Sequence, residues 1–129
     1  MTLDSSALVA ILFGEAGYLD LVDHILAADE VRISAPTLVE ASLVLAGRRK
    51  STGAGEVEAL AKELGVTVVP FGERESQAAV AAFLRYGRGR HPAALNFGDC
   101  LAYAAASVAG DSLLFVGDDF RKTDITAAY

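Results

Sequence analysis

Short apolar strands alternate with longer helical patterns along the whole sequence, and this alternation constrains the fold more than any other feature. Strands are predicted at residues 1–3, 31–34, 66–69 and 112–116. Helices are predicted from their apolar periodicity at residues 7–12, 18–27, 37–46, 56–64, 73–86 and 97–109. Because neighbouring parallel strands need a crossover between them, this order predicts an α/β fold, with a short, mostly parallel sheet of four or five strands flanked by helices.

The length and composition fit one domain over residues 1–129. The chain is 53% hydrophobic, which provides material for a core, yet it has no apolar run of membrane-spanning length. We therefore expect no contact with a membrane. Cys100 is the only cysteine, so the chain cannot form an internal disulfide. That cysteine content and the lack of a secretion signal after Met1 predict a cytoplasmic protein.

The charge is unbalanced. Seventeen acidic residues against eleven basic ones leave a net charge of −6, which counts against a nucleic-acid partner if the charge is spread evenly. It is not spread evenly, because basic residues gather in two places. They are Arg48, Arg49 and Lys50 in one group and Arg85, Arg88 and Arg90 in the other. The composition therefore does not exclude nucleic acid.

Acidic residues recur where predicted strands give way to helices. Asp4 follows the first strand, Glu40 lies one turn into the helix after the second, and Asp118 and Asp119 follow the last. Asp99 lies in the first turn of its helix. Right-handed crossovers place all strand-to-helix loops at one edge of a parallel sheet, so these carboxylates are expected to share that edge. Hard oxygen ligands of this kind favour Mg²⁺ or Mn²⁺.

Other interpretations of Asp4 stay open from the residues alone. Ser5 or Ser6 is expected to cap the first helix, but Asp4 could itself be no more than a helix cap. A phosphoacceptor receiver domain is disfavoured, because the third strand ends at Pro70 without an acid. A haloacid-dehalogenase site needs a second aspartate two residues after the first, and Ser6 stands there.

Four segments together carry a resemblance to a known family. They are residues 3–10 (LDSSALVA), Glu40, residues 96–100 (NFGDC) and residues 113–120 (LLFVGDDF). In this order and spacing they resemble a PIN-domain ribonuclease, most closely the VapC toxins of bacterial toxin–antitoxin pairs. The resemblance spans essentially the whole chain and implies a PIN-like fold.

The resemblance implies an acidic pocket that is both catalytic and metal-binding. Its members are Asp4, Glu40, Asp99 and Asp119, with Asp119 favoured over Asp118 because Asp-Phe is the pair found in this branch. Asp118 would then support the site, together with Ser6 and Asn96 through hydrogen bonds. The cofactor implied is Mg²⁺, with Mn²⁺ as a substitute. The activity implied is hydrolysis of phosphodiester bonds in RNA, such as tRNA or rRNA, by a metal-activated water.

Four residues near one helix end are candidate RNA contacts. Arg85, Arg88, Arg90 and His91 surround a glycine-rich loop and could bind phosphates next to the cut, although solvated charge is the alternative for each arginine. Phe97 and Tyr103 fit a helix core better than base stacking.

The resemblance also implies partners. It predicts a cognate VapB-type antitoxin that wraps the protein and obstructs the acidic pocket, and a homodimer that becomes a heterotetramer or larger with the antitoxin. Apolar faces near the first and third helices could support the dimer. Two alternatives are a PIN-like binding module without catalytic activity and a metal-dependent phosphatase.

Overall fold

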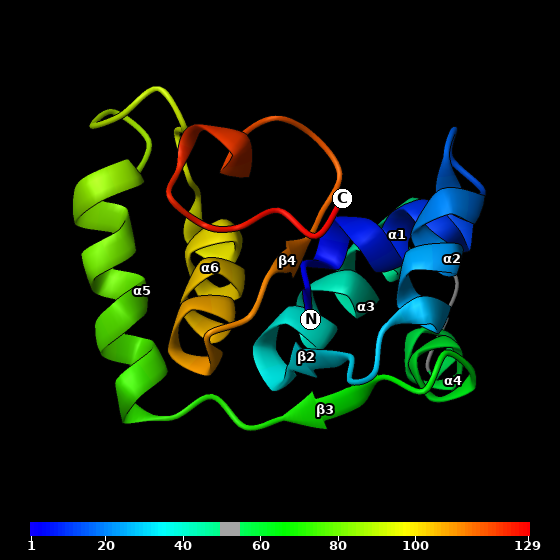
Figure 1. The fold of residues 1–129 in the computed structure, drawn as a ribbon. Coiled ribbons are helices and arrows are strands. Elements are labelled where there is room, and N and C mark those ends of the chain that lie inside the picture. Colours follow the sequence, from blue (N-terminus) through cyan, green and yellow to red (C-terminus); the bar gives the residue numbers. More distant parts are fainter. Residues whose placement is uncertain (50–54) are drawn as a thin grey trace.

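The fold is taken from a computed structural model, which describes residues 1–49 and 55–129 (Figure 1). The elements come in the order β1 (Thr2–Leu3), α1 (Ser5–Phe13), α2 (Tyr18–Ala27), β2 (Arg32–Ser34), α3 (Ala35–Arg49), α4 (Glu56–Glu63), β3 (Thr67–Val69), α5 (Glu73–Tyr86), α6 (Phe97–Ala109), β4 (Leu113–Leu114) and the 3₁₀ helix η1 (Phe120–Lys122). Each strand is separated from the next by helices, which confirms the predicted alternation.

The four strands form one parallel sheet in the order β3-β2-β1-β4. The chain builds outward from β1 to β3 and then returns through α5 and α6 to place β4 on the other side of β1. The sheet therefore changes winding direction between β1 and β4. In open α/β sheets, ligands bind beyond the carboxyl ends of the strands at such a switch point. The strand order alone therefore predicts a ligand site in the crevice at the carboxyl ends of β1 and β4.

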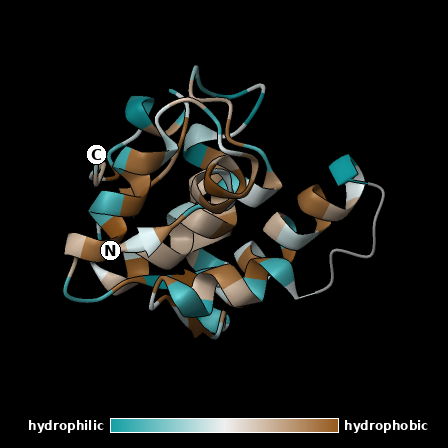
Figure 2. Cartoon of the chain, turned by 90° about the vertical axis from the view of Figure 1, so that its right-hand side faces the viewer, coloured by the Kyte–Doolittle hydropathy of each residue, from teal (hydrophilic) through white to brown (hydrophobic). Residues whose placement is uncertain are grey.

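Two hydrophobic clusters lie on opposite faces of the sheet. Leu3, Ile33 and Leu114 are fully buried toward α1, α2, α3 and α4, whereas Leu113 and Phe115 pack toward α5 and α6. Figure 1 shows these two groups of helices on either side of the strands. Figure 2 shows hydrophobic and hydrophilic stripes on the same helices, the pattern of helices with one face against a core. Packing on both faces stabilises a sheet whose strands have only two or three residues.

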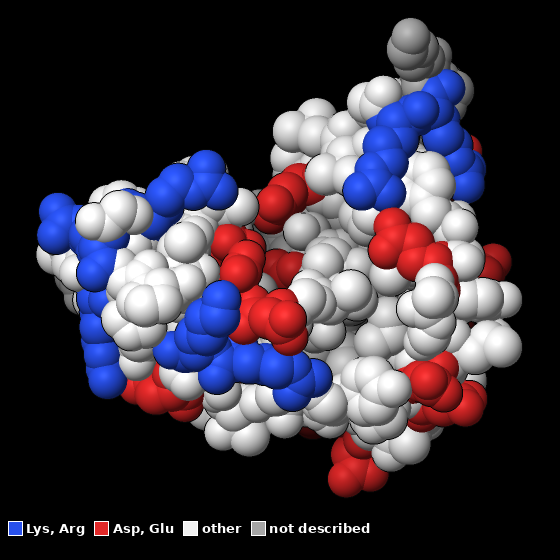
Figure 3. All heavy atoms as spheres, turned by 90° about the horizontal axis from the view of Figure 1, so that it is seen from above, with Lys and Arg blue, Asp and Glu red and all other residues white. Residues whose placement is uncertain are grey.

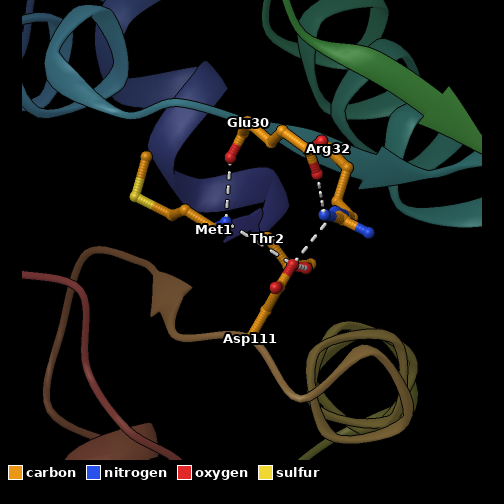
Figure 4. Close-up of polar contacts among 5 residues, drawn as sticks. All are labelled: Met1, Thr2, Glu30, Arg32 and Asp111. Atoms are coloured by element: carbon orange, nitrogen blue, oxygen red, sulfur yellow. Dashed lines mark hydrogen bonds and ion pairs between the residues drawn. The ribbon is translucent and has the colours of Figure 1, made fainter.

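The amino-terminal edge of the sheet is held by a polar cluster around Asp111 (Figure 4). The Asp111 carboxylate accepts a hydrogen bond from the Thr2 hydroxyl at 2.8 Å and pairs with the Arg32 guanidinium at 3.1 Å. The Met1 amino group lies 3.5 Å from the same carboxylate and donates to the Glu30 carbonyl oxygen at 2.9 Å. These contacts join β1, β2 and the segment before β4 at the edge opposite the crevice.

Two local predictions differ from the structure. The N-cap of α1 is Asp4 rather than Ser5 or Ser6, because the Asp4 side chain accepts from the Ser6 backbone N–H. Helix α3 does not end before Gly47 but continues to Arg49. A single glycine weakens a helix without ending it, and the basic last turn suits the negative end of the helix dipole. Of the loop predicted at residues 48–55, residues 50–54 lie outside the described residues.

The other helices fall where they were predicted, with α2, α5 and α6 matching at both ends. Within residues 1–49 and 55–129, no helix is both long enough and apolar enough to cross a membrane.

Candidate active site

Asp4 lies at the switch point and is held by the start of its own helix. It follows β1 directly, is only 4% exposed, and its backbone N–H donates to the Leu114 carbonyl of β4 at 2.9 Å. Its carboxylate accepts from both the backbone N–H of Ser6, at 3.0 Å, and the Ser6 hydroxyl, at 2.5 Å. Asp4 is therefore a helix cap and a crevice residue at once, so the two interpretations left open by the sequence are compatible.

Ser6 connects the two strands that flank the switch point. While its hydroxyl donates to Asp4, its oxygen accepts a hydrogen bond from the backbone N–H of Val116 at 3.0 Å. Val116 lies in the loop that follows β4, and the same loop carries Asp118 and Asp119. One hydroxyl thus fixes both the orientation of the Asp4 carboxylate and the start of the acidic loop.

Glu40 reaches the crevice from α3, and a glycine gives it room. Gly98 lies in the first turn of α6, and a Cβ atom placed on it would overlap both carboxylate oxygens of Glu40. The Oε2 atom of Glu40 is buried without a hydrogen-bond partner among the described residues. Leaving a buried carboxylate oxygen unpaired is costly, so this atom is set up to receive a ligand.

Asp99 is held by the N-terminus of α6. Its carboxylate accepts from the backbone N–H of Asn96 at 2.9 Å, while the Asn96 side chain accepts from the backbone N–H of Asp99 at 2.9 Å. This reciprocal capping box fixes the side chain at the positive end of the helix dipole. Asn96 thus supports Asp99 by fixing its position.

The carboxyl groups of the crevice act on one another electrostatically. Burial raises the pKa of Asp4, and the hydrogen bonds from Ser6 and Ser5 oppose that rise. Burial also raises the pKa of Glu40, and the charges of Asp4 and Asp99 raise it further, whereas a hydrogen bond from the Ser5 side chain to the carboxylate lowers it. Like charges held together in a partly buried place are costly, and a cation would relieve that cost.

Asp99 connects this group to the last loop and to the basic rim. Burial raises its pKa, and Asp4 and Asp119 raise it further, whereas the Asn96 hydrogen bond and the Arg88 guanidinium lower it. Asp119 therefore lies within electrostatic reach of Asp99. Asp118 is exposed on the same loop. The structure thus brings Asp4, Glu40, Asp99 and Asp119 into one neighbourhood.

The fit of this group to a metal ion depends on how many side chains can bind at once. Among the residues that the structure describes, no three His, Cys, Asp or Glu side chains converge closely enough to hold an ion jointly. Mg²⁺ does not need such a cage, because it keeps several waters and is usually held by one or two carboxylates together with substrate phosphates. The all-oxygen donor set and the unpaired Glu40 oxygen fit that mode of binding.

Basic side chains lie around the acidic crevice. Figure 3 shows acidic side chains gathered in a hollow at this edge of the molecule, with Lys and Arg side chains along its rims. Arg88 is close enough to lower the pKa of Asp99. Arg85 instead pairs with Asp124 at 2.9 Å, and the Arg90 guanidinium lies over the Phe83 ring. The Nδ1 atom of His91 accepts from the Ala93 backbone N–H at 3.1 Å.

One of the two aromatic residues predicted to lie in a helix core differs from that prediction. Phe97 is 81% exposed, because it occupies the first position of α6 and points away from both clusters. Tyr103 lies where it was predicted, half-buried against the second cluster, and its hydroxyl donates to Asp124 at 2.7 Å. Apolar periodicity marks a helix face but does not show whether another element covers it.

Two features of the site were missed at the level of sequence. Gly98 gave one weak signal, since a glycine in a helical first turn stands where better helix formers are usual. The other feature is a groove of about 720 Å³ between α3, α5 and α6 that reaches Glu40. Its apolar lining includes Val39, Leu43, Phe71, Val80, Phe97 and Leu101.

Comparison with known proteins gives a consistent result. The PIN domain family matches residues 1–125. Ribonuclease VapC36 of Mycobacterium tuberculosis is 44% identical over 126 residues, covering 97% of this chain and 91% of that protein. Ribonuclease VapC of Mycolicibacterium smegmatis is 40% identical over 130 residues, covering all of both chains.

Solved structures share the fold at lower identity. The crystal structure of Mycobacterium tuberculosis VapC20, titled a Sarcin-Ricin loop cleaving toxin, aligns with a TM-score of 0.76 and 17% identity over 97% of this chain and 95% of that one. A toxin–antitoxin complex from Klebsiella pneumoniae aligns with a TM-score of 0.72 and 16% identity over 99% of this chain and 97% of that one.

Proposed function

Because the chain belongs to the PIN-domain family, and within it to the VapC ribonucleases, we propose that it is the ribonuclease toxin of a toxin–antitoxin pair. Its reaction is endonucleolytic hydrolysis of phosphodiester bonds in RNA. The carboxyl cluster at the switch point is the observation that carries this proposal. Three carboxyl groups there, those of Asp4, Glu40 and Asp99, have pKa values raised by burial. The charge of Asp4 also raises the pKa of both Glu40 and Asp99.

We propose Mg²⁺ as the cofactor, with Mn²⁺ as a substitute. Asp4, Glu40, Asp99 and Asp119 are the residues that would hold it, through one or two carboxylates at a time. When bound, such an ion polarises a phosphodiester and lowers the pKa of a water molecule beside it. The unpaired Oε2 of Glu40 supports this assignment, since it has no protein donor to satisfy it among the described residues.

The chain's own residues position and balance this site. Ser6 holds the Asp4 carboxylate in one orientation, and Asn96 does the same for Asp99 through the capping box. Asp118 remains a supporting residue in this proposal. Arg88, whose charge lowers the pKa of Asp99, would bind a phosphate of the RNA beside the scissile one. Arg90 and His91 extend the same loop and would contact the strand further from the cut.

We also propose a class of substrate and a class of partner, without naming the individual molecules. Structured RNA, such as tRNA or rRNA, is the substrate that we propose to test first. The regulator would be a VapB-type antitoxin with a segment that covers the groove beside Glu40, because that groove is apolar and continuous with the acids. We propose a homodimer that forms a heterotetramer or larger assembly with the antitoxin, acting in the cytoplasm. Light scattering of the free protein and of the complex measures both states.

The decisive experiment is RNA cleavage by the purified protein without its antitoxin. Wild type is expected to cut structured RNA with Mg²⁺ or Mn²⁺ and to lose the activity in EDTA. Asp99→Asn, which removes a charge at nearly constant volume, is expected to be inactive but folded. Asp23→Asn, on the exposed side of α2, makes the same change of charge away from the site and should stay active. A folded protein that cuts no RNA with either metal would favour a binding module instead.

A further inference from the structure

A second carboxylate, outside the crevice, ties three segments of the chain together. Asp124 lies in the segment after η1, and its Oδ2 atom accepts from the Arg85 guanidinium at the end of α5 at 2.9 Å. Its Oδ1 atom accepts from the Tyr103 hydroxyl, in the middle of α6, at 2.7 Å. We call Arg85, Tyr103 and Asp124 the latch. Because the Arg85 and Asp124 side chains are 64% and 51% exposed, the ion pair alone is weak, and the latch depends on both hydrogen bonds to the one carboxylate.

The latch lies about one turn of α6 away from the acidic site. Asp99 and Tyr103 are four residues apart on α6, so their side chains share one face of that helix about 6 Å apart along its axis. Asp119 lies within electrostatic reach of Asp99, and Asp124 binds Tyr103. The segment from 119 to 124 therefore follows one turn of α6, with one contact at each end.

The chain between the two ends is short and stiff. Residues 120–122 form the helix η1, Phe120 is 3% exposed and packs in the second cluster, and the Thr123 hydroxyl donates to the Phe120 carbonyl at 2.7 Å. The backbone N–H of Ile125 in turn donates to the Thr123 hydroxyl at 3.2 Å. These contacts restrict how far Asp124 can move relative to Phe120, the residue next to Asp119.

Asp119 needs such a restraint because it faces a like charge. The Asp119 and Asp99 carboxylates repel each other across the crevice until a cation lies between the acids. Phe120 anchors the loop in the core on one side of Asp119, and Ile125 and Ala127 pack against the second cluster further along the chain, whereas Asp124 between them is exposed. The latch adds a polar contact that ties the exposed Asp124 to α5 and α6, beside the apolar contacts of the neighbouring residues.

We propose that Asp124, held by Arg85 and Tyr103, is a positioning residue that keeps Asp119 opposite Asp99 and so sets the affinity of the site for a divalent cation. This inference rests on the proposed function, since it assumes that the carboxylates bind the ion. It gives Arg85 a structural partner in place of the RNA contact expected from the sequence.

The test measures binding of Mn²⁺ directly, from the EPR signal of the free ion, together with RNA cleavage as a function of Mn²⁺ concentration. Tyr103→Phe removes one hydroxyl and no charge, and Asp124→Asn removes the charge at nearly constant volume. The double variant is expected to bind Mn²⁺ about tenfold more weakly, the low end of the effect of residues that orient metal ligands. Its kcat at saturating Mn²⁺ should stay near that of wild type, because the latch does not touch the reacting atoms.

The matched control is Glu30→Gln, which removes a carboxylate from the exposed Glu30–Arg32 ion pair at the opposite edge of the sheet. It makes the same change of charge as Asp124→Asn and should leave Mn²⁺ affinity unchanged. In the Asp124→Asn background, Arg85→Gln should have little further effect, because the two residues act as one unit. Arg85→Lys retains the positive charge and should keep most of the affinity.

Three results would overturn the proposal. The first is Mn²⁺ affinity in folded latch variants equal to that of Glu30→Gln. The second is a lower kcat at saturating Mn²⁺ with unchanged affinity, which would place the latch in the chemistry itself. The third is a rise of KM for RNA on Arg85→Gln in the Asp124→Asn background, the signature of a direct RNA contact. Failure of wild type to bind Mn²⁺ and to cut RNA would instead refute the proposed function, and this inference with it.

Discussion

Replacing Gly98 by alanine tests how closely the α6 N-terminus and Glu40 depend on each other. Gly98 is buried in the first turn of α6, and the added methyl group would overlap both carboxylate oxygens of Glu40. Because the neighbouring backbone belongs to a helix, the Glu40 side chain is the part that has to move. The substitution therefore displaces one carboxylate of the candidate site without changing any charge.

The expected effects on stability and on activity differ in size. Alanine is favoured over glycine in a helix by about 1 kcal/mol, while forcing an extra methyl group into a packed place costs about 1–3 kcal/mol. The net loss of unfolding free energy is thus about 0–2 kcal/mol, and the protein stays folded. Misplacing a reacting group by about 1 Å can cost about 100-fold in rate, so kcat/KM for RNA should fall about 100-fold.

The assay pairs RNA cleavage with denaturant unfolding, and Gly47→Ala is the control. Gly47 lies in α3, and a Cβ atom there meets nothing within 4 Å. Gly47→Ala should therefore stabilise the protein by about 0.5–1 kcal/mol and leave cleavage unchanged. In a Glu40→Gln background, Gly98→Ala should reduce cleavage little further, because the affected group is already disabled. Full activity of Gly98→Ala would refute the argument.

Three further outcomes are expected. Ser6→Ala removes the hydroxyl between Asp4 and Val116, and should cost about 1–3 kcal/mol of unfolding free energy in urea and lower cleavage. Asp99→Asn removes one repulsive charge, so its metal-free melting temperature should equal or exceed that of wild type in calorimetry. Burial raises the pKa of Asp4 and Glu40 in the folded state, and nearby charges raise that of Glu40 further, so the folded protein binds more protons than the unfolded chain just above their usual pKa range. The metal-free free energy of unfolding should consequently rise as pH falls from 7 toward that range. Saturating Mg²⁺ should stabilise the protein most at pH 7 and so remove much of this pH dependence. A metal-free free energy of unfolding that does not change with pH would contradict the prediction.

Much of the fold could be predicted from local patterns. Apolar periodicity located α2, α5 and α6, and short apolar runs, β-branched in β2 and β3, located the strands, because these signals depend only on residues a few positions apart. The acids at strand ends could be assigned to one edge of a parallel sheet by topology alone. The assignment of individual acids to metal binding stays a prediction for the experiments above.

Contacts between distant segments were not predictable in the same way. The hydrogen bond between Val116 and Ser6 spans 110 positions and depends on β4 lying beside β1. The exposure of Phe97 and the bond between Tyr103 and Asp124 depend on which helix faces find a neighbour. A pattern of apolar spacing is the same whether a face is covered or open to solvent.

The sequence by itself determined that strands alternate with helices and that carboxylates follow the strands, because both are properties of short segments. Only the tertiary structure decided that Gly98 makes room for Glu40 and that Asp124 holds the loop of Asp119 against α6. The physical reason is that both contacts arise when the chain returns from β3 through α5 and α6 to place β4 next to β1. That return is set by the packing of two hydrophobic clusters on opposite faces of one sheet, which no local segment encodes.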